Sequence, residues 1–282
     1  MAARKTVLIT GCSDGGIGSA LAATFQQRDF HVFATARDLT KMGDLKGLPN
    51  VTFLTLDIVN HDDIENAVKV VANHAGGNGT LDVLISNAGR NQFMPILDEN
   101  LDSVRKLFDI NFIGPIDLTQ SFAPLLIKAK GIVAYITSTS GYLNIPYMGA
   151  YAASKRSIEI VGETLRLELA PFGVDVIEVV TGAVKSKGQT YFGDFKLPQG
   201  SLYKNIEPTI ASRAQGKDGV PRMDTLEYAN AVTENILERV SGRVWHGVFS
   251  ERVKSSTIPK DVPQSAMDAG AVIGTGLDAV GK

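Results

Sequence analysis

The chain has 282 residues, of which 44% are hydrophobic and 21% charged, and a formal net charge of −2 at pH 7. A chain of this size and composition can bury a substantial core, and we expect residues 1–282 to form one α/β domain. Scattered basic residues argue against a nucleic-acid partner, and no apolar run approaches the ~20 residues of a membrane span. The single cysteine cannot form an intramolecular disulfide, so a reducing compartment, with the cytoplasm as the default, is expected.

Short apolar runs rich in β-branched residues alternate with helical patterns along the chain. An apolar stripe at 3.6-residue spacing, preceded by Asn60 as a cap, predicts a helix that runs through Val71. Asp224 and Glu227 form an acidic variant of the capping box and predict a helix to about Arg239. The alternation predicts a doubly wound parallel sheet of about seven strands with helices on both faces. The expected strands are 7–10, 32–35, 51–56, 81–86, 132–137, 174–180 and, more weakly, 243–249.

The first expected strand leads directly into a glycine-rich turn, which a helical pattern follows. This is the order of a Rossmann-type dinucleotide site, because glycines allow a tight turn and close approach, and the helix N-terminus offers free N–H groups to phosphates. A glycine cluster alone would more often be an ordinary loop, but its place on the first strand favours the binding site. Cys12 is expected to be a small residue of the turn rather than a catalytic thiol. The candidate contacts are Gly11, Cys12, Ser13, Gly16, Ile17 and Gly18.

Tyr151 and Lys155 lie four residues apart in a helical pattern, so their side chains fall on one face. A free phenol titrates near ~10, and a neighbouring ammonium favours the phenolate, which makes the pair a device for proton transfer. Ser138 precedes them in the spacing S-x12-Y-x3-K. Alone the pair is weak evidence, since an exposed helical tyrosine and lysine would look the same, but the motifs upstream favour catalysis.

These motifs occur together in the order and spacing of the short-chain dehydrogenase/reductase family. They are T-G-x4-G-x-G at residues 10–18, Asn87-Ala88-Gly89 after an expected buried strand, Asn111, Ser138, and Tyr151 with Lys155. Over about residues 5–250 the chain therefore resembles this family. The first loop is one residue longer than usual. In this detail, and in residues 180–186 and 201–204, the chain looks most similar to the fungal branch that includes NADPH-dependent acyl-dihydroxyacetone-phosphate reductases.

The resemblance implies catalytic roles for four residues. Tyr151 would give a proton to the oxyanion that develops when the nicotinamide delivers a hydride to a carbonyl carbon. Ser138 would donate a hydrogen bond to the same oxygen. Lys155 would hold the nicotinamide ribose and lower the pKa of the tyrosine. Asn111 would position a water that relays protons to Lys155.

Further cofactor contacts are implied by position in the family pattern. Asp57 and Ile58 resemble the pair that meets the adenine, although a strand-end aspartate that caps a turn is an equally good explanation. Ser186 matches the hydroxyl that holds the nicotinamide carboxamide. Most relatives have proline where this chain has Thr181, which puts the rigidity of that turn in question. The remaining contacts of this group are Asn87, Ala88, Gly89 and Val184.

The cofactor preference is set at the end of the second expected strand. Ala36 takes the place where NAD-dependent relatives usually carry an acid, and Arg37 follows it. Arginine can pair bidentately with a 2′-phosphate, whereas an acid would bind the ribose hydroxyls and repel that phosphate. NADPH and NADP+ are therefore favoured over NAD. Asp38 opposes this interpretation, and Asp14 stands where some NADP-dependent relatives carry an extra basic residue.

Substrate recognition is expected in two aromatic segments of little regular pattern. Tyr142 and Tyr147 belong to the stretch between the catalytic serine and tyrosine. Tyr191 and Phe195 belong to residues 187–219, a stretch broken by Gly and Pro that we expect to act as a lid over an apolar substrate. The alternative is that these aromatic residues fill a small satellite core.

The C-terminal tail, residues 250–282, is charged at its start and then rich in Ala and Gly, which argues against membrane association. Covering the domain, joining a subunit contact and staying mobile all remain open for this tail. Trp245 and His246 are expected to pack rather than to bind ligands, and no His, Cys or Asp cluster resembles a metal site.

The leading functional prediction is a soluble, NADPH-dependent reductase of a hydrophobic ketone or aldehyde, or the reverse alcohol dehydrogenase, of the kind found in fungal secondary metabolism. Three alternatives stay open: an acyl-dihydroxyacetone-phosphate-type lipid reductase, a redox-neutral conversion that uses the bound cofactor, and a non-catalytic dinucleotide sensor. A non-catalytic sensor would normally lack Tyr151 or Lys155, and both residues are present here. In the family, helices ending near positions Lys128 and Ala170 commonly join subunits, which implies a homodimer or homotetramer.

Overall fold

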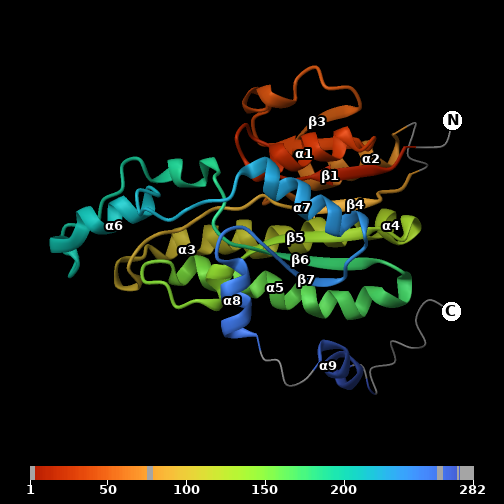
Figure 1. Cartoon of the computed structure of the whole chain (residues 1–282). Coiled ribbons are helices and arrows are strands. Elements are labelled where there is room, and N and C mark those ends of the chain that lie inside the picture. The colour runs from red at the N-terminus through yellow and green to blue at the C-terminus, as the bar shows by residue number, and fades with distance from the viewer. Residues whose placement is uncertain (1–3, 75–78, 259–262, 272, 274–282) are drawn as a thin grey trace.

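The fold is built on a sheet of seven parallel strands (Figure 1). A computed structural model describes residues 4–74, 79–258, 263–271 and 273, without the side chains of residues 189–191, 267, 270 and 271. The strand order β3-β2-β1-β4-β5-β6-β7 confirms the predicted doubly wound α/β class. The strands are β1 Thr6–Ile9, β2 His31–Ala36, β3 Val51–Thr55, β4 Val83–Ser86, β5 Ile132–Ser138, β6 Asp175–Thr181 and β7 Gly242–His246.

Helices cover both faces of this sheet, as the alternating pattern predicts. Helices α1 (Ile17–Gln27) and α7 (Thr225–Leu237) pack against each other on one face. Helices α2 (His61–Ala72), α4 (Gly114–Ala129) and α5 (Gly149–Leu169) cover the other face. Helix α3 (Leu101–Phe108) leads into α4 through a π-helical turn, Asp109–Ile113.

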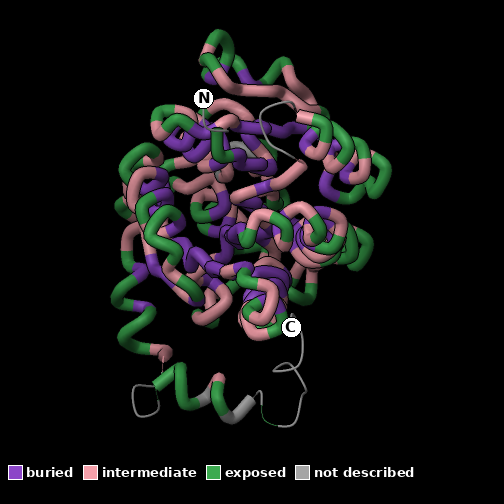
Figure 2. Tube along the Cα trace, turned by 90° about the vertical axis from the view of Figure 1, so that its right-hand side faces the viewer, coloured by how far each residue is buried: buried purple, intermediate pink, exposed green. Residues whose placement is uncertain are grey.

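Each face of the sheet carries its own apolar core. In Figure 2 the buried segments, drawn in purple, run mainly through the interior of the molecule. Val32 and Ala34 belong to the cluster beneath α1 and α7, whereas Phe33 between them belongs to the cluster beneath α2, α4 and α5. Successive side chains of a strand point to opposite faces. A sheet covered on both faces therefore requires the nearly continuous apolar runs seen in the sequence.

The two predicted helix caps are present. The side chain of Asn60 accepts a hydrogen bond from the Asp62 N–H at the start of α2, and Asp224 accepts from the N–H groups of Leu226 and Glu227 at the start of α7. Helix α7 ends earlier than predicted, at Leu237, because Arg239 has a left-handed backbone with φ 56°.

The last strand also differs from the sequence prediction. Strand β7 ends at His246 rather than continuing to Phe249. Gly247 has a φ of 94°, and Phe249 has a φ of 68°, so both depart from the extended conformation and turn the chain into helix α8 (Ser250–Thr257). After the strand, Val248 forms an isolated antiparallel bridge with Ala183, and Phe249 is exposed.

The order in which strands are added to the sheet changes side at β1, although all the strands are parallel. Strands β2 and β3 lie on one side of β1, and strands β4 to β7 lie on the other. In open α/β sheets a ligand crevice forms at the carboxyl ends of the strands where this change of side occurs. The ends of β1 and β4 therefore define where a dinucleotide site belongs.

Two segments lie outside the helix-covered sheet. Residues 187–219 form two short 3₁₀ turns, Lys187–Phe192 and Lys204–Ile206, and helix α6 (Glu207–Ala214); α6 projects from one end of the molecule, at the left of Figure 1. Helix α9 (Gln264–Ala271) lies below α5 in the same view. An ion pair of 2.8 Å between Arg166 and Asp268 joins α9 to α5, so this described part of the tail covers the domain.

No helix among the described residues combines the length and the apolar character needed to cross a bilayer.

Candidate active site

The glycine loop forms a cradle between β1 and α1. Gly11 has a φ of 74°, which only glycine adopts at low cost. A Cβ atom built on Gly18 would lie 2.4 Å from the carbonyl oxygen of Gly11 and 2.5 Å from Nδ2 of Asn87, so only glycine fits there. No side chain caps the first turn of α1. The close approach and the uncapped N–H groups fit a pyrophosphate at this helix N-terminus.

The extra residue of this loop is anchored by acidic side chains. The Asp14 carboxylate accepts hydrogen bonds from the N–H groups of Gly43 and Asp44, at 2.9 and 2.8 Å, and Asp44 in turn accepts from the Gly15 N–H at 3.2 Å. Asp14 therefore holds the longer loop to the segment that follows β2. This local role accounts for an acid at a position where the resemblance pointed to a basic residue.

The ends of β1 and β4 are tied together by Thr10 and Asn87. The hydroxyl of Thr10 accepts hydrogen bonds from the N–H groups of Asn87 and Ala88, at 3.0 and 2.9 Å. The Asn87 amide donates to the carbonyl oxygens of Thr10 and Gly11, at 2.7 and 3.1 Å. The sequence analysis did not assign a role to Thr10, although its place directly before the first glycine was the available signal.

Gly89, shortly after the end of β4, lies close to the side chains of Asn111 and Lys155. A Cβ atom on Gly89 would lie 3.2 Å from Lys155 Nζ and 3.3 Å from Asn111 Oδ1, so the absence of a side chain there leaves room for both groups. Asn111 lies in the π-helical turn, accepts from the Arg90 N–H at 2.8 Å, and donates to Arg90 O and to Ser154 Oγ, at 2.9 and 3.0 Å. Single π turns often mark functional sites.

Ser154 was missed by the sequence analysis. It directly precedes Lys155, is fully buried, and fixes the Asn111 amide while donating to the Tyr151 carbonyl at 2.7 Å. A polar residue beside a candidate catalytic lysine was the signal that could have identified it.

Two of the proton-transfer groups, Tyr151 and Lys155, have shifted pKa values. Dehydration raises the pKa of the Tyr151 phenol, and a hydrogen bond with Ser138 acts in the opposite direction. Burial lowers the pKa of Lys155 to about 8. The Lys155 ammonium donates to the carbonyl oxygen of Ile136 at 2.9 Å, which holds it beneath the end of β5. A tyrosine in contact with a serine, beside a lysine that exchanges protons near neutrality, can perform acid–base chemistry.

The end of β2 presents Arg37 to solvent and turns Asp38 away from a ligand role. The Asp38 carboxylate accepts from Thr40 N and Thr40 Oγ1, at 3.0 and 2.6 Å, and these bonds hold its pKa below the usual value. Lys41 lies 3.8 Å from the same carboxylate. The acid that opposed an NADP preference is thus used to cap the turn after Arg37.

Several other predicted contacts are occupied within the protein. Cys12 is fully buried, its N–H donates to Thr35 O at 2.8 Å, and burial raises the pKa of its thiol to about 12. Asp57 caps a turn by accepting from the Val59 N–H at 3.3 Å, in line with the alternative considered for it, and Ile58 is buried. The remaining loop members, Ser13 and Ile17, lie in the cradle described above.

The chain after β6 passes over the glycine loop. Val184 is buried and pairs with Met223 in an isolated parallel bridge. Ser186 accepts from the Gly188 N–H at 3.4 Å and so starts the 3₁₀ turn. The next residue, Lys187, donates from its N–H to Gly15 O at 3.4 Å, and a Cβ atom on Gly15 would lie 2.7 Å from Lys187 Cε. Residues 184–188 thus lie against the site of the expected phosphates.

The aromatic residues expected to contact substrate divide into two groups. Tyr147 and Phe195 pack around a small apolar cluster formed by Phe93, Leu197, Ile210 and Ala214. The Tyr147 ring lies 6.0 Å from that of Phe93, measured between centroids. The structure therefore joins residues 187–219 to the stretch before α5, an arrangement expected both for a substrate wall and for a satellite core. The side chain of Tyr191 lies outside the described residues.

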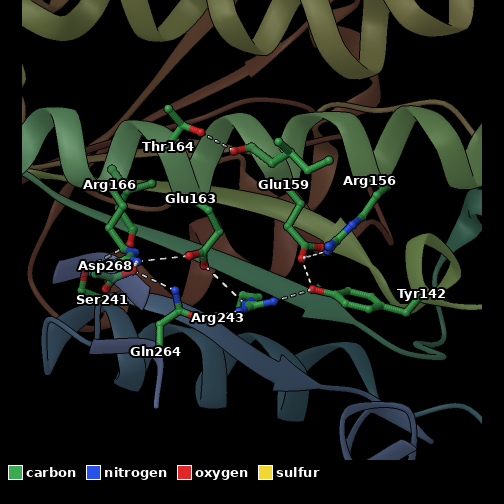
Figure 3. A network of polar contacts seen from close by, with 12 residues as sticks. Tyr142, Arg156, Glu159, Glu163, Thr164, Arg166, Ser241, Arg243, Gln264 and Asp268 are labelled. Atoms are coloured by element: carbon green, nitrogen blue, oxygen red, sulfur yellow. Dashed lines mark hydrogen bonds and ion pairs between the residues drawn. The ribbon is translucent and has the colours of Figure 1, made fainter. Parts of the chain in front are cut away.

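Tyr142 does not join this group. Its ring packs on Trp245 with centroids 5.0 Å apart, and the Arg156 guanidinium lies over the ring, 4.5 Å from its centroid. Its hydroxyl contacts Glu159 and Arg243 (Figure 3). Burial raises the pKa of its phenol to about 12. Tyr142 thus belongs to a polar cluster between α5, β7 and the tail, beside a cavity of about 690 Å³.

Nothing in the described part of the chain resembles a metal centre: no group of three or more His, Cys, Asp or Glu side chains is placed to hold an ion.

Comparison with known proteins identifies the family. The short chain dehydrogenase family model matches residues 5–195. The short-chain dehydrogenase PC-15 of Penicillium crustosum is 44% identical over 244 residues, which are 86% of this chain and 89% of that protein. The NADPH-dependent 1-acyldihydroxyacetone phosphate reductase of Schizosaccharomyces pombe is 35% identical over 278 residues, covering 97% of this chain and 91% of that protein.

Solved structures agree on the fold. A short-chain dehydrogenase from Streptomyces avermitilis superposes with a TM-score of 0.76 at 26% identity, covering 99% of this chain and 98% of the other. One from Burkholderia cenocepacia, solved in complex with NADP, has a TM-score of 0.72 at 23% identity and covers 96% of this chain and 98% of the other. The predicted resemblance to the fungal branch is thereby confirmed, and the chain belongs to the short-chain dehydrogenase family of oxidoreductases.

Proposed function

We propose that the protein is an NADP(H)-dependent reductase of an apolar ketone or aldehyde, or the reverse alcohol dehydrogenase. The observation that carries this proposal is the grouping of Asn111, Lys155, Tyr151 and Ser138 beside the glycine cradle at the β1–β4 edge. The dinucleotide would supply or accept the hydride. A sensor that only bound the dinucleotide would have no need of this proton-transfer group.

The residues divide the work of binding and proton transfer. Gly11, Gly16 and Gly18 with the N-terminus of α1 would hold the pyrophosphate, since a side chain on Gly18 would close the cradle. Tyr151 would give its proton to the carbonyl oxygen, and Ser138 would donate a hydrogen bond to the same atom.

Lys155 and Asn111 would support this proton transfer without contacting the substrate. The buried Lys155 has a lowered pKa, so it would exchange protons near neutral pH and could restore the proton that Tyr151 gives up. Asn111, fixed by Arg90 and Ser154, would hold a water for that exchange. Asn87, Ala88, Gly89, Val184 and Ser186 would contact the dinucleotide.

The preference for NADP(H) over NAD(H) is supported by the side chains after β2. Arg37 is exposed where a 2′-phosphate would arrive, and Asp38 and Asp14 are both engaged by backbone N–H groups of nearby turns. The Schizosaccharomyces pombe relative is described as NADPH-dependent and shares 35% identity with this chain. An arginine with no competing acid favours the extra phosphate.

An apolar substrate is supported by the cluster that links Tyr147 with Phe195 and its neighbours. We infer that residues 187–219 form a lid over this substrate. The acyl-dihydroxyacetone-phosphate-type lipid reductase remains the second candidate, because one relative of 35% identity carries that description. A redox-neutral conversion is distinguished only by its product.

A homodimer or homotetramer stays a prediction, supported by Ile160 on α5, which is 55% exposed.

The test is oxidation of NADPH and NADH with a panel of apolar ketones, aldehydes and acyl-dihydroxyacetone phosphates, with identification of the products. We expect NADPH-dependent formation of an alcohol. Tyr151→Phe should keep NADPH binding and lower turnover by at least ~10²-fold, because the general acid is lost. Full turnover of Tyr151→Phe at saturating substrate would show that the proton comes from another group. A product with no net change of oxidation state would favour the redox-neutral alternative.

A further inference from the structure

Thr181 occupies the position directly beside the catalytic serine. Strands β5 and β6 pair in parallel, and the Cα partner of Ser138 is Thr181, the last residue of β6. Paired residues on neighbouring strands point to the same face of a sheet. Val179, two residues before Thr181, and Ile136, two before Ser138, belong to one apolar cluster, so Ser138 and Thr181 share that face.

The hydroxyl of Thr181 forms a pair with a buried phenol from α7. Thr181 Oγ1 lies 2.6 Å from the hydroxyl oxygen of Tyr228, and Tyr228 has no exposed surface. Thr181 Oγ1 also donates to Val179 O at 3.1 Å. Because the single threonine proton is used in that bond, the Tyr228 hydroxyl is the donor in the pair.

Other contacts make this pair rigid and place it close to the reacting groups. The hydroxyl of Thr139, the residue after Ser138, donates to the Thr181 carbonyl at 3.3 Å. The Tyr228 ring meets the edge of His246, which is itself held by Asn235 at 2.6 Å. Burial raises the pKa of Tyr228, and a charge on Tyr151 acts in the same direction.

We propose that Tyr228 is a positioning residue of the active site, which acts through Thr181 to hold Ser138 and Thr139 at the end of β5 and so keeps the Ser138 hydroxyl against the Tyr151 phenol. The pair fixes the turn at a position where the family resemblance pointed to a proline. Tyr228 does not touch substrate in this scheme. The proposal rests on the proposed function for its catalytic consequence, but its effect on Tyr151 is measurable without cofactor.

The chain offers a matched control on the opposite face of the sheet. Tyr135 on β5 is 1% exposed, and its hydroxyl lies 2.7 Å from Thr119 Oγ1 on α4. Tyr135→Phe therefore removes the same kind of buried phenol–threonine bond as Tyr228→Phe, but among the residues of the other core cluster. Any loss common to both variants reflects stability alone.

The experiment measures the ionisation of Tyr151 in the cofactor-free protein by ultraviolet difference titration against Tyr151→Phe, together with kcat, KM and NADPH affinity. Tyr228→Phe should move the Tyr151 titration and the pH profile of kcat to higher pH, because the hydrogen bond from Ser138 weakens. It should lower kcat by about tenfold and leave NADPH affinity within about twofold. Tyr135→Phe should match the wild type in all these measurements.

Variants of Thr181 separate hydroxyl chemistry from shape. Thr181→Ser should keep the wild-type titration, and Thr181→Val should behave like Tyr228→Phe. The double variant Thr181→Val with Tyr228→Phe should be no worse than either single one, since both remove one interaction. The proposal is overturned if Tyr228→Phe titrates like Tyr135→Phe, or if the two changes add. If the wild type reduces no carbonyl with either cofactor, the proposed function fails, while the titration still decides the role of Tyr228.

Discussion

Glycines at the dinucleotide cradle and glycines in the lid segment serve opposite purposes. At the cradle, a Cβ atom on Gly18 would collide with the backbone of Gly11 at 2.4 Å. In residues 187–219, a Cβ atom on Gly193 or Gly200 would meet nothing within 4 Å. The first kind is required by close packing, and the second leaves the backbone unconstrained. The proposed cofactor site is thus fixed by polar contacts between strand ends, whereas the proposed substrate wall is held by aromatic packing.

The largest expected effect tests this contrast directly. Gly18→Ala forces a methyl group onto the Gly11 carbonyl, so we expect NADPH binding to fall by about a hundredfold, which corresponds to the upper end of the ~1–3 kcal/mol that overpacking costs. The matched change Gly200→Ala should leave binding unchanged and the fold equally or slightly more stable. Fluorescence titration of NADPH and thermal melting check both. Equal binding by the two variants would show that the cradle does not hold the dinucleotide.

Arg37→Ala should weaken NADPH binding by about 1–3 kcal/mol and change NADH binding little, because a charge-assisted contact with the 2′-phosphate is lost. Titration of both cofactors against wild type and variant measures this. Lys46→Ala, which removes another exposed cation from the segment between β2 and β3, serves as the control. Equal affinity of the wild type for NADPH and NADH would contradict the proposed preference.

The lid side of the comparison is tested by KM and by hydrogen exchange. Phe195→Ala should raise KM by about three- to tenfold with little change in NADPH affinity, because the contact of one partly buried aromatic ring, worth about 1 kcal/mol, is lost. Tyr191→Ala is expected to act in the same way. Leu202→Ala, in the same segment but 80% exposed, should have the wild-type KM. Residues 187–219 should gain protection when NADPH and substrate are added; unchanged protection together with wild-type KM values would identify a satellite core.

The last test concerns stability rather than the site. Glu178 on β6 is fully buried, and burial first, then the neighbouring Glu163, raise the pKa of its carboxyl. The unfolded chain releases this proton at lower pH than the folded one. The group therefore makes the protein less stable as pH rises from the ordinary carboxyl pKa through neutrality, by at most about 1.4 kcal/mol per pH unit.

Glu178→Gln should remove that slope, as measured by urea unfolding. The variant should therefore gain more stability over the wild type at pH 8 than at pH 5. Glu168→Gln, an exposed carboxylate on α5, should keep the wild-type pH dependence. A Glu178→Gln variant with an unchanged slope would place the titrating group elsewhere in the cluster around Glu163.

The parts of the fold set by local sequence were predictable. Strand runs, the Asn60 and Asp224 caps and the glycine turn depend on residues close in the chain. Thr10, Ser154 and the Thr181–Tyr228 pair were not assigned, because their partners lie on other strands and helices and depend on strand register. Predictions for the catalytic residues rested on a motif, whose members the fold brings to one edge.

Tyr142 shows that a residue close to a catalytic residue in the sequence can join a different cluster in the structure. It lies four residues after Ser138, yet the 3₁₀ turn Thr139–Tyr142 directs it toward Trp245 and Arg243 rather than toward Tyr147. In a 3₁₀ turn, which has about three residues per turn, each residue rotates the side-chain direction by about 120°. The distance from a catalytic residue along the chain therefore did not indicate which cluster Tyr142 would join.

The π-helical turn at Asp109–Ile113 has a consequence for comparing this chain with its relatives. Such a turn holds one more residue than an α-helical turn, and each residue of a helix advances by about 100°. Deleting one residue there would leave a continuous helix from α3 to α4 but rotate the Asn111 amide away from Arg90 and Ser154. Alignments through residues 101–129 should therefore allow a one-residue gap at this turn, and a relative without the extra residue would need another side chain to replace the Asn111 amide.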